Sequence, residues 1–346
     1  MSDAIRVGLV GFGYASKTFH APLIGGTPGM ALKAVASSDA DKVHADWPGV
    51  KVMSAPGDLL DDPDIDLVVI ATPNDTHFPL AKAALEAGKH VVVDKPFTVT
   101  LSQARELESL AMHCGRILSV FHNRRWDSDF LTVSALINEG QLGEVCYFEL
   151  HFDRFRPQVR QRWREQAGPG SGIWYDLAPH LLDQVVVLFG LPVSITVDLA
   201  QLRPGAQSTD YFHAVLAYPQ RRVVLHGTLL AAAESARFIV HGSRASYIKY
   251  GLDPQEERLK NGERLPQEDW GYDMRDGTLT RAEGDERSQE KWLTLPGNYP
   301  AYYAAMRDAL NGVGENPVPA SEAIQIMTLI ELGIESARHR ATLSLV

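Results

Sequence analysis

Near its start the chain reads Ile5-Arg6-Val7-Gly8-Leu9-Val10-Gly11-Phe12-Gly13-Tyr14-Ala15-Ser16, an apolar run followed by a glycine-rich turn. The order matches the dinucleotide-binding motif G-x-G-x-x-G, except that Ser16 stands at the third glycine position. The first glycine permits a tight turn, the second lets the backbone approach a pyrophosphate, and the third position needs only a small side chain. Backbone N–H groups at the start of the following helix then face the phosphates. We therefore predict that a dinucleotide contacts Gly11, Gly13, Tyr14, Ala15 and Ser16.

Short apolar runs alternate with helical patterns through the first third of the chain. The runs are nearly continuous in Val, Ile and Leu, as in the strands of a parallel sheet that is covered on both faces. Such alternation predicts the α/β class and a doubly wound parallel sheet, the Rossmann architecture. The expected strands are 5–10, 31–36, 67–71, 90–93 and 117–121, and the expected helices are 17–24, 77–87 and 101–113.

The rhythm changes after about residue 122, where strand patterns follow one another with few helices between them. Strands in succession predict a mostly antiparallel sheet, so we expect an α+β domain with a large open sheet. We divide the chain into a dinucleotide-binding domain, 1–121, and a substrate-binding and oligomerisation domain, 122–346. The polar stretch 253–290 is expected to be a long loop or an insert. The expected strands of the second domain are 145–152, 193–201, 211–218, 222–230, 237–241 and 246–250, and its expected helices are 177–189, 299–311 and 320–338.

Composition narrows the class of protein. The 346 residues carry a formal charge of −10 and are 45% hydrophobic, which is ordinary for a globular enzyme and argues against a nucleic-acid surface. The richest basic cluster, Arg154 to Arg164, is interrupted by aromatic residues and flanked by Asp153 and Glu165, and it better suits a loop that lines a site for a polar ligand. The two cysteines, Cys114 and Cys146, have no metal-ligand or redox spacing, and no metal site is expected.

The chain shows neither the layout of a signal peptide nor an apolar run near the ~20 residues of a membrane helix, so we expect a cytoplasmic protein that binds no membrane. An open sheet with helices on one face leaves its other face exposed to solvent unless another chain covers it. This favours a homo-oligomer, a dimer or a tetramer, built through the sheet of the second domain.

The end of the second expected strand bears on the choice between NAD and NADP. NAD enzymes usually place an acid there to bind the ribose 2′-hydroxyl. In this chain Ser37 and Ser38 occupy that point and Lys42 follows within reach, a set that suits a 2′-phosphate. Asp39 keeps NAD open, and Lys42 can equally be an exposed helix lysine. NADP is therefore the expected cofactor, with NAD as the alternative.

A second loop expected at the cofactor follows the strand 67–71 and reads Thr72-Pro73-Asn74-Asp75-Thr76-His77. Loops beyond the carboxyl ends of parallel strands form the ligand crevice of such sheets. We therefore expect Thr72, Pro73 and Asn74 to line the cofactor. His77 either joins them or helps to cap the helix that begins there.

Lys95, in Asp94-Lys95-Pro96, stands where the apolar run 90–93 ends and therefore in the same crevice. Transfer of a hydride from a secondary alcohol needs a base for the hydroxyl proton and a donor or cation that stabilises negative charge on the oxygen. Lys95 can supply the cation, and a cis Lys95–Pro96 bond is one way of aiming its side chain. The alternative is a surface lysine that follows a strand.

Asp176 and His180 supply the remaining parts of an acid/base site. They follow the flexible run Gly168-Pro169-Gly170-Ser171-Gly172 and lie four residues apart, so on a helical turn their side chains share a face. Pro179 is tolerated only near a helix start, which places the pair there. Histidine exchanges protons near neutrality, and Asp176 can orient the imidazole or bind a substrate hydroxyl. The structural alternative is Asp176 as a helix cap and His180 packed.

These features together resemble the Gfo/Idh/MocA oxidoreductase family over essentially the whole chain. The resemblance rests on the glycine motif, on Asp94-Lys95-Pro96, where the family usually has Glu-Lys-Pro, and on the pair Asp176 and His180. It implies an NAD- or NADP-dependent enzyme in which Lys95, Asp176 and His180 are catalytic and also bind the substrate, a sugar or cyclitol. It also implies that Asp94 and Lys95 lie at the cofactor.

Three further segments, 119–127, 162–165 and 211–213, resemble NADP-dependent scyllo-inositol dehydrogenases. The resemblance implies that Trp163 and Arg164 lie at the cofactor and that Asn123 and Arg125 lie at a small polyhydroxylated substrate. For Arg125 the alternative is a structural cluster at the domain junction. The expected function is oxidation or reduction of a cyclitol or sugar. The alternatives are an aldose or anhydro-sugar reductase with the same machinery, or a sensor that binds NADP without turnover.

Overall fold

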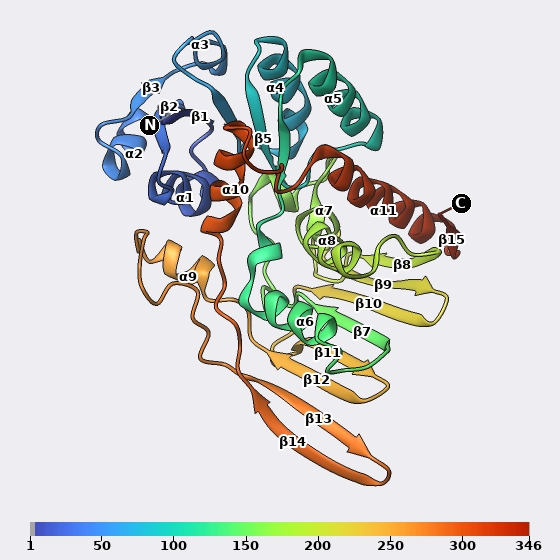
Figure 1. Cartoon of the computed structure of the whole chain (residues 1–346). Coiled ribbons are helices and arrows are strands. Elements are labelled where there is room, and N and C mark those ends of the chain that lie inside the picture. Colours follow the sequence, from blue (N-terminus) through green and yellow to red (C-terminus); the bar gives the residue numbers. More distant parts are fainter. Residues whose placement is uncertain (1–3, 346) are drawn as a thin grey trace. The chain divides into compact units, whose positions relative to one another are not determined.

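The computed structural model describes residues 4–345, which form two compact units (Figure 1). Of the described residues, unit 1 contains 4–123 together with the later segments Gln255–Trp270 and Asn298–Met327. Unit 2 contains Arg124–Pro254, Gly271–Gly297 and 328–345.

Two late segments return to unit 1, although the sequence-based division at residue 121 placed them in the second domain. In one of them Tyr302 packs against Phe121 with ring centroids 4.8 Å apart, and its hydroxyl is 2.8 Å from Ser119 Oγ. In the other, Gln255 Oε1 accepts a hydrogen bond from the backbone N–H of Tyr299. Contacts between residues so far apart in the sequence leave no mark on the local pattern from which the division was drawn.

Unit 1 is built on a six-stranded, wholly parallel sheet with the order β3-β2-β1-β4-β5-β6. This is the Rossmann order, so the predicted doubly wound α/β fold is confirmed. The order reverses between β1 and β4, and the loops that follow these strands leave a crevice. β3 was missed because three residues at a sheet edge give no apolar run. The bounds are β1 Ile5–Val10, β2 Met30–Ala36, β3 Lys51–Met53, β4 Leu67–Ile70, β5 His90–Asp94 and β6 Leu118–Phe121.

Several helices of unit 1 begin and end at residues suited to those positions. Asp39 accepts a hydrogen bond from the N–H of Lys42 before α2, and Thr100 forms a reciprocal capping box with Gln103 before α5. α5 ends at Gly115, whose φ of 61° favours glycine. A π-helical turn over Ser16–His20 leads into α1. The bounds are α1 Ala21–Gly26, α2 Ala40–Asp46, α3 Pro56–Leu60, α4 Asn74–Glu86, α5 Leu101–Cys114, α9 Gln255–Lys260 and α10 Pro300–Leu310.

Unit 2 is built on a nine-stranded sheet with the order β14-β13-β12-β11-β7-β10-β9-β8-β15. β7 and β10 pair in parallel, and the other neighbouring pairs are antiparallel. The predicted α+β domain with a large, mostly antiparallel sheet is thus confirmed. The bounds are β7 Val145–His151, β8 Ser194–Ala200, β9 Tyr211–Tyr218, β10 Arg221–Thr228, β11 Ala236–Gly242, β12 Ala245–Tyr250, β13 Gly277–Glu283, β14 Glu286–Trp292 and β15 Leu343–Ser344.

The two faces of this sheet differ. On one face Phe148 packs against Phe189 of α8, with ring centroids 5.1 Å apart. Side chains alternate along a strand, so the other face, here called the open face, carries the partly exposed side chains of Glu149, His151, His213 and His226. No helix within residues 4–345 combines the length and the apolarity that crossing a membrane requires. The remaining helices are α6 Ser128–Asn138, α7 Gly172–Asp176, α8 Ala178–Phe189 and α11 Ala320–His339, with 3₁₀ turns at Asn123–Trp126 and Trp163–Glu165.

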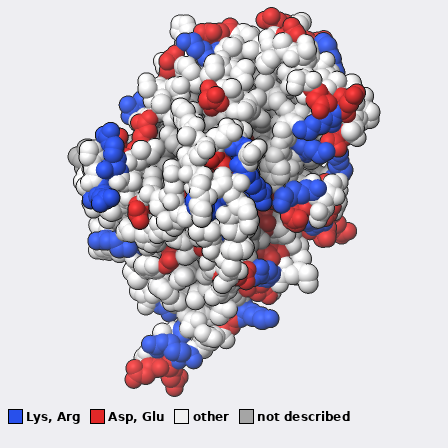
Figure 2. All heavy atoms as spheres, turned by 180° about the vertical axis from the view of Figure 1, so that it is seen from behind, with Lys and Arg blue, Asp and Glu red and all other residues white. Residues whose placement is uncertain are grey.

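Of the two alternatives for 253–290, the long loop is wrong, because the stretch contains α9, β13 and most of β14. β14 is almost wholly exposed along its length, so no apolar alternation marked it. The turn Gly284-Asp285, with a φ of 59° at Gly284, was a readable signal, since glycine in this position is typical of two-residue hairpins. Acidic and basic side chains gather at the tip of this hairpin, at the bottom of Figure 2.

Candidate functional site

The turn after β1 contains two glycines that serve different purposes. Gly11 has a φ of 85°, and a Cβ there would lie 2.9 Å from Thr72 Cγ2 and 3.1 Å from the carbonyl O of Ala71. A Cβ on Gly13, by contrast, would meet no atom within 4 Å among the residues that the structure describes. Ser16 is buried, and its hydroxyl donates a 2.8 Å hydrogen bond to the carbonyl O of Gly11, so its side chain holds the turn. The space over Gly13 fits the approach of a pyrophosphate.

A cleft of about 780 Å³ opens at the carboxyl ends of β1, β2 and β4, a volume suited to a cofactor. The predicted cofactor residues that line it are Gly11, Gly13, Ser37, Ser38, Lys42, Thr72 and Pro73. Ala15, Ser16, Asn74 and His77 were also predicted, but the residues described as lining the cleft do not include them.

The cleft also has walls that sequence reasoning did not select. Ser54 and Pro56 follow β3, the strand that was missed. Thr76, Pro79 and Leu80 lie in the first turns of α4, and helical spacing after Thr72 could have pointed to them. The other additional lining residues are Val10, Phe12, Ala36 and Asp39.

A second, smaller recess of about 290 Å³ adjoins the cleft at Gly13 and Lys42. Tyr14 lies here, and its hydroxyl donates a 2.6 Å hydrogen bond to Glu256 Oε1. Part of the lining comes from α9 and the residues after it, which no local signal connected with the glycine motif. The basic residues of the recess are Lys17, Lys42, Lys260 and Arg264.

Asp39 was the reason for keeping NAD as the alternative cofactor. Its side chain caps the helix that follows β2. Its Oδ1 accepts a 3.0 Å hydrogen bond from the backbone N–H of Lys42 and caps α2. Ser37 Oγ accepts a 3.1 Å bond from the N–H of Asp39 and closes the turn. The exposed side chains of Ser38 and Lys42 stand at the same point. Their chemistry suits a phosphate better than it suits a ribose diol.

His77 was predicted either to contact the cofactor or to cap a helix. Its imidazole is fully buried, with Nδ1 2.8 Å from the carbonyl O of Pro96 and Nε2 3.0 Å from the carbonyl O of Thr72. Burial lowers the pKa of His77, against the opposing effects of Asp94 and the two carbonyl groups. The geometry favours a positioning role, in which His77 ties the loop after β4 to the loop after β5.

Lys95 directly follows β5, and the Lys95–Pro96 bond is cis, which the sequence had raised as one way of aiming the side chain. Asp94 is buried, and its Oδ1 accepts a 2.9 Å hydrogen bond from the backbone N–H of Lys95. Burial alone would raise the pKa of Asp94, but His20 and the charge of Lys95 lower it overall. The ionised carboxylate of Asp94 therefore fixes the backbone of Lys95, and its own contact with a cofactor stays a prediction.

The sequence had suggested that Asp176 and His180 lie on one continuous helix. In the structure of unit 2 they do not. α7 ends at Asp176, Leu177 interrupts with a φ of −112°, and α8 follows. Pro179 is the reason, because it has no N–H to donate to the preceding turn. It lies in the first turn of α8, where it is tolerated. His180 is thus fixed in the first turn of α8, with 6% of its surface exposed.

Asp176 lies between two arginines. Its Oδ2 is 3.9 Å from Arg154 Nη1, and its Oδ1 is 3.5 Å from Arg164 Nε. Arg164 in turn stacks on Trp163, with its guanidinium carbon 4.5 Å from the ring. The structure therefore brings together the predicted residues Asp176, Trp163 and Arg164, and it adds Arg154 from the basic loop. Charged groups of both signs in fixed positions can hydrogen-bond a ligand that carries several hydroxyl groups.

The basic loop from Arg154 to Arg164 is held by two buried charges of unit 2. Arg203 donates a 3.0 Å hydrogen bond to the carbonyl O of Arg156. Glu165 accepts a 2.9 Å bond from the backbone N–H of Arg160. Burial lowers the pKa of Arg156 to about 10, and the charges of the neighbouring arginines add to this effect. Such a loop is suited to electron-rich oxygen atoms of a ligand.

Arg125, predicted to bind the substrate, is engaged by Asp183 of α8. Its Nε and Nη2 donate to the two carboxylate oxygens at 2.9 and 2.6 Å, a bidentate pair that is largely buried. Asp183 follows His180 by one helical turn, so the pair fixes the helix that carries His180. This geometry favours the structural alternative for Arg125. Asn123, the other predicted substrate residue, is buried where the first segment of unit 1 ends.

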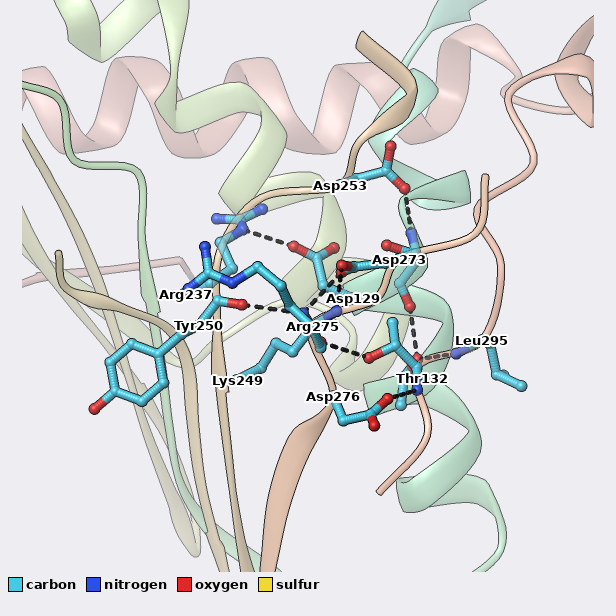
Figure 3. Close-up of polar contacts among 12 residues, drawn as sticks. Asp129, Thr132, Arg237, Lys249, Tyr250, Asp253, Asp273, Arg275, Asp276 and Leu295 are labelled. Carbon is cyan, nitrogen blue, oxygen red and sulfur yellow. Dashed lines mark hydrogen bonds and ion pairs between the residues drawn. The ribbon is translucent and has the colours of Figure 1, made fainter. Parts of the chain in front are cut away.

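A buried polar network joins the helices of unit 2 to its sheet (Figure 3). Arg237 of β11 donates to Asp129 of α6 at 3.1 Å and to Gln184 of α8 at 3.2 Å. Lys249 of β12 pairs with Asp273 at 2.8 Å. Each of these buried charges faces an opposite charge. The network therefore positions α6 and α8 without an uncompensated buried charge.

Comparison with known proteins covers nearly the whole chain. Residues 5–122 match the Gfo/Idh/MocA family description "Oxidoreductase family, NAD-binding Rossmann fold", and residues 134–345 match "Oxidoreductase family, C-terminal alpha/beta domain". The chain is 81% identical over 345 residues to the uncharacterized oxidoreductase YdgJ of Escherichia coli (strain K12), which covers 100% of both chains. It is 36% identical to the scyllo-inositol 2-dehydrogenase (NADP(+)) IolW of Bacillus subtilis (strain 168), covering 99% of this chain and 96% of that protein. The solved structure of the putative oxidoreductase YPO2259 from Yersinia pestis has a TM-score of 0.96 and 67% identity, and covers 100% of this chain and 98% of that one.

Proposed function

The chain belongs to the Gfo/Idh/MocA family of oxidoreductases, and on this premise we propose that it is an NADP-dependent dehydrogenase of a cyclitol or sugar. The reaction interconverts a secondary alcohol and its ketone, with scyllo-inositol as the first candidate substrate. The observation that carries the proposal is the cleft of about 780 Å³ at the carboxyl ends of β1, β2 and β4. The relationship to the NADP-linked enzyme IolW, over 99% of this chain, supports the choice of substrate and cofactor.

The preference for NADP over NAD rests on the end of β2. Ser38 and Lys42 line the cleft there and offer a hydroxyl and an ammonium group to a 2′-phosphate. Asp39, the candidate partner of a ribose 2′-hydroxyl, caps α2 through one carboxylate oxygen. The adjoining basic recess adds positive charge on the same side, from Lys260 and Arg264. Charge-assisted hydrogen bonds of this kind favour the phosphorylated cofactor.

The proposed chemistry divides between the two units. When bound, the nicotinamide supplies or accepts the hydride. Lys95 donates a hydrogen bond from Nζ to the substrate oxygen and stabilises the negative charge that grows there as the hydroxyl proton leaves. A ring nitrogen of His180 takes that proton in the oxidation and returns it in the reduction.

Asp176 and its neighbours are proposed to hold the hydroxyl groups that do not react. The carboxylate of Asp176 accepts hydrogen bonds from hydroxyls, whereas Arg154 and Arg164 donate to them. A polyhydroxylated ring presents both donors and acceptors, so a mixed set of this kind can distinguish its stereoisomers. Trp163 supports Arg164 by stacking beneath its guanidinium group.

A second copy of the chain is the partner that we propose for the open face of the sheet in unit 2. Glu149, His151, His213 and His226 are only partly exposed there, and a sheet face of this size is commonly covered in an assembly. Light scattering of the purified protein tests this point. A monomeric mass at working concentrations would overturn it.

The deciding experiment for the function is a panel of substrates assayed by NADPH absorbance. The purified protein is incubated with NADP or NAD and with scyllo-inositol, myo-inositol and common aldoses. Reduction of NADP by scyllo-inositol, with little reduction of NAD, is the expected result. Activity with an aldose alone would keep the chemistry and discard the cyclitol. Binding of NADPH without turnover of any polyol or ketose would favour the sensor instead.

A further inference from the structure

Three potential metal ligands meet on the open face of the nine-stranded sheet, where β7 and β10 pair in parallel. The register sets His226 of β10 beside His151 of β7. The pairing continues past the end of β7, since the N–H of Phe152 donates to the carbonyl O of His226. Asp153 therefore follows His151 on the same face, as the alternation of a strand requires. The proposed dehydrogenase mechanism uses none of these three side chains.

The ligand atoms of the cluster are already close to one another. His151 Nδ1 lies 3.0 Å from Asp153 Oδ2, and His226 Nδ1 lies 2.8 Å from Asp153 Oδ1. One ligand atom from each residue falls within 4.8 Å of the other two. Around a tetrahedral zinc ion, with bonds of about 2.1 Å, the ligand atoms are about 3.4 Å apart. Small side-chain rotations are therefore enough to admit an ion.

His151 is oriented in the way that metal-binding histidines are. Its Nε2 donates a 2.7 Å hydrogen bond to Glu149 Oε1, and the hydroxyl of Tyr147 donates to the other carboxylate oxygen of Glu149. A ligating histidine usually gives its second ring N–H to a carboxylate, which sets the tautomer and makes the ligating nitrogen more basic. Without an ion, Nδ1 is hydrogen-bonded to Asp153 Oδ2, so an ion that binds there takes the place of the proton on Nδ1 while the N–H of Nε2 stays on Glu149.

The composition and the access of the cluster also suit a cation. Asp153 accepts hydrogen bonds from both histidines, and Glu149 adds a second carboxylate beside His151. A cavity of about 400 Å³ that is lined in part by His151 and Asp153 provides a path for an ion.

We propose that His151, Asp153 and His226 bind one divalent transition-metal ion, with zinc as the best match, and that Glu149 orients His151. Two imidazoles and one carboxylate suit Zn²⁺, whereas Mg²⁺ and Ca²⁺ prefer sites made of oxygen. A water molecule completes the coordination. The ion links β7 to β10 and so stabilises the sheet of unit 2. The proposal does not depend on the dehydrogenase function.

Zinc titration of the full chain tests the proposal. After dialysis against a chelator, Zn²⁺ is titrated into the protein by calorimetry, and thermal unfolding is recorded with and without the ion. We expect binding of a single ion per chain and a higher Tm. Glu149→Gln should weaken the affinity by roughly 10–100-fold, and His226→Ala should weaken it further. Co²⁺ in place of Zn²⁺ should show the visible absorption of a tetrahedral site.

His213→Ala is the matched control. His213 lies opposite His226 on β9, with ring centroids 6.0 Å apart, and is outside the proposed set of ligands. Its variant should bind Zn²⁺ as the wild type does. Wild-type protein that neither binds Zn²⁺ nor gains in Tm would overturn the proposal and leave Asp153 as a simple bridge between two histidines. Equal losses of affinity in His213→Ala and His226→Ala would also overturn it. The cobalt spectrum of the wild type keeps the test valid if His226→Ala does not fold.

Discussion

The cofactor cleft of unit 1 and the part of unit 2 that is proposed for catalysis are built in different ways. In unit 1 the cleft is shaped by backbone and small side chains at the ends of parallel strands, and Gly11 shows this most directly. In unit 2 the residues proposed for catalysis stand among charged side chains, with Arg125 paired to Asp183 beside His180 and two arginines around Asp176. The first kind of site depends on local conformation, and the second depends on partners brought from distant parts of the chain.

The two kinds of site lose stability for different reasons. A glycine turn is destabilised when a new side chain contacts the opposite strand, whereas a buried ion pair is destabilised when one partner is removed and the other charge is left uncompensated. The two units should therefore respond differently to substitution, and the following predictions are arranged from the largest expected effect to the smallest.

The largest effect should fall on turnover and spare the cofactor. His180→Ala removes the proposed proton-exchanging group of unit 2, so kcat with the substrate found in the panel should fall by roughly 10²–10⁴-fold. NADPH should still bind, because the residues that line the cleft belong to unit 1. Steady-state turnover assays measure kcat, and NADPH fluorescence titration measures the affinity for the cofactor. An unchanged kcat would contradict the proposed role, and loss of both properties would contradict the division between the units.

The next effect should fall on the stability of unit 2. Asp183→Ala leaves the largely buried Arg125 without its bidentate partner and should lower the free energy of unfolding by about 3–5 kcal/mol. The control is Glu234→Ala, which breaks an exposed pair with Arg275 and should cost less than about 1 kcal/mol. Urea denaturation followed by circular dichroism gives both values. Similar losses in the two variants would show that burial of the pair does not matter here.

The two glycines of unit 1 should separate stability from binding. Gly11→Ala places a Cβ against Thr72 and Ala71 at a φ of 85°, and should cost about 1–3 kcal/mol of stability. Gly13→Ala meets no described atom within 4 Å, so its Tm should stay near that of the wild type while NADPH binds more weakly. Thermal unfolding with and without NADPH measures both. A Gly13→Ala variant with unchanged NADPH affinity would argue that the pyrophosphate lies elsewhere.

Lys42 tests the choice of cofactor. Lys42→Ala removes the ammonium group at the end of β2 and should weaken NADP binding by about tenfold, while the affinity for NAD changes little. Lys33→Ala, at an exposed position within β2, is the matched control and should alter neither affinity. Equal losses for NADP and NAD in Lys42→Ala would place the lysine away from the 2′-phosphate.

The smallest effect is a dependence of stability on pH. The pKa of buried His77 is lowered from its ordinary value near 6.5, so below about pH 6.5 the unfolded chain takes up a proton that the folded chain does not. Stability should therefore fall as the pH drops from about 7 towards 5, and His77→Asn should flatten this part of the Tm curve. His113→Asn, at an exposed position on α5, should keep the slope of the wild type. An unchanged slope in His77→Asn would contradict the assignment.

Local pattern was sufficient for much of unit 1. The apolar runs of β1, β4 and β5 and the glycines between β1 and α1 predicted the parallel sheet and the place of the cleft, because these features need only neighbours in the sequence. The cis bond at Lys95–Pro96 had been raised only as one possibility, and the structure contains it. β3 and β14 were not predicted, because edge strands that are short or exposed contain few apolar residues in a recognisable pattern.

The candidate site could be predicted only in part. The roles of Asp176 and His180 stay a prediction, and the break between them at Leu177 depends on how Pro179 fits the preceding turn. The resemblance assigned Arg125 to the substrate, and no local pattern reveals that its Nε and Nη2 donate to Asp183.

By itself the sequence determined the two kinds of sheet and the family, and with them the glycine turn after β1. These properties follow from periodicity and from backbone conformations that are decided within a few residues. Only the tertiary structure decided that Arg264 lines the recess beside Gly13 and that His226 lies next to Asp153. Such contacts join residues that are distant along the chain, and whether two charges meet depends on how strands and helices pack. A ligand site made of backbone can be read in advance, whereas one made of charged partners becomes visible only after the chain has folded.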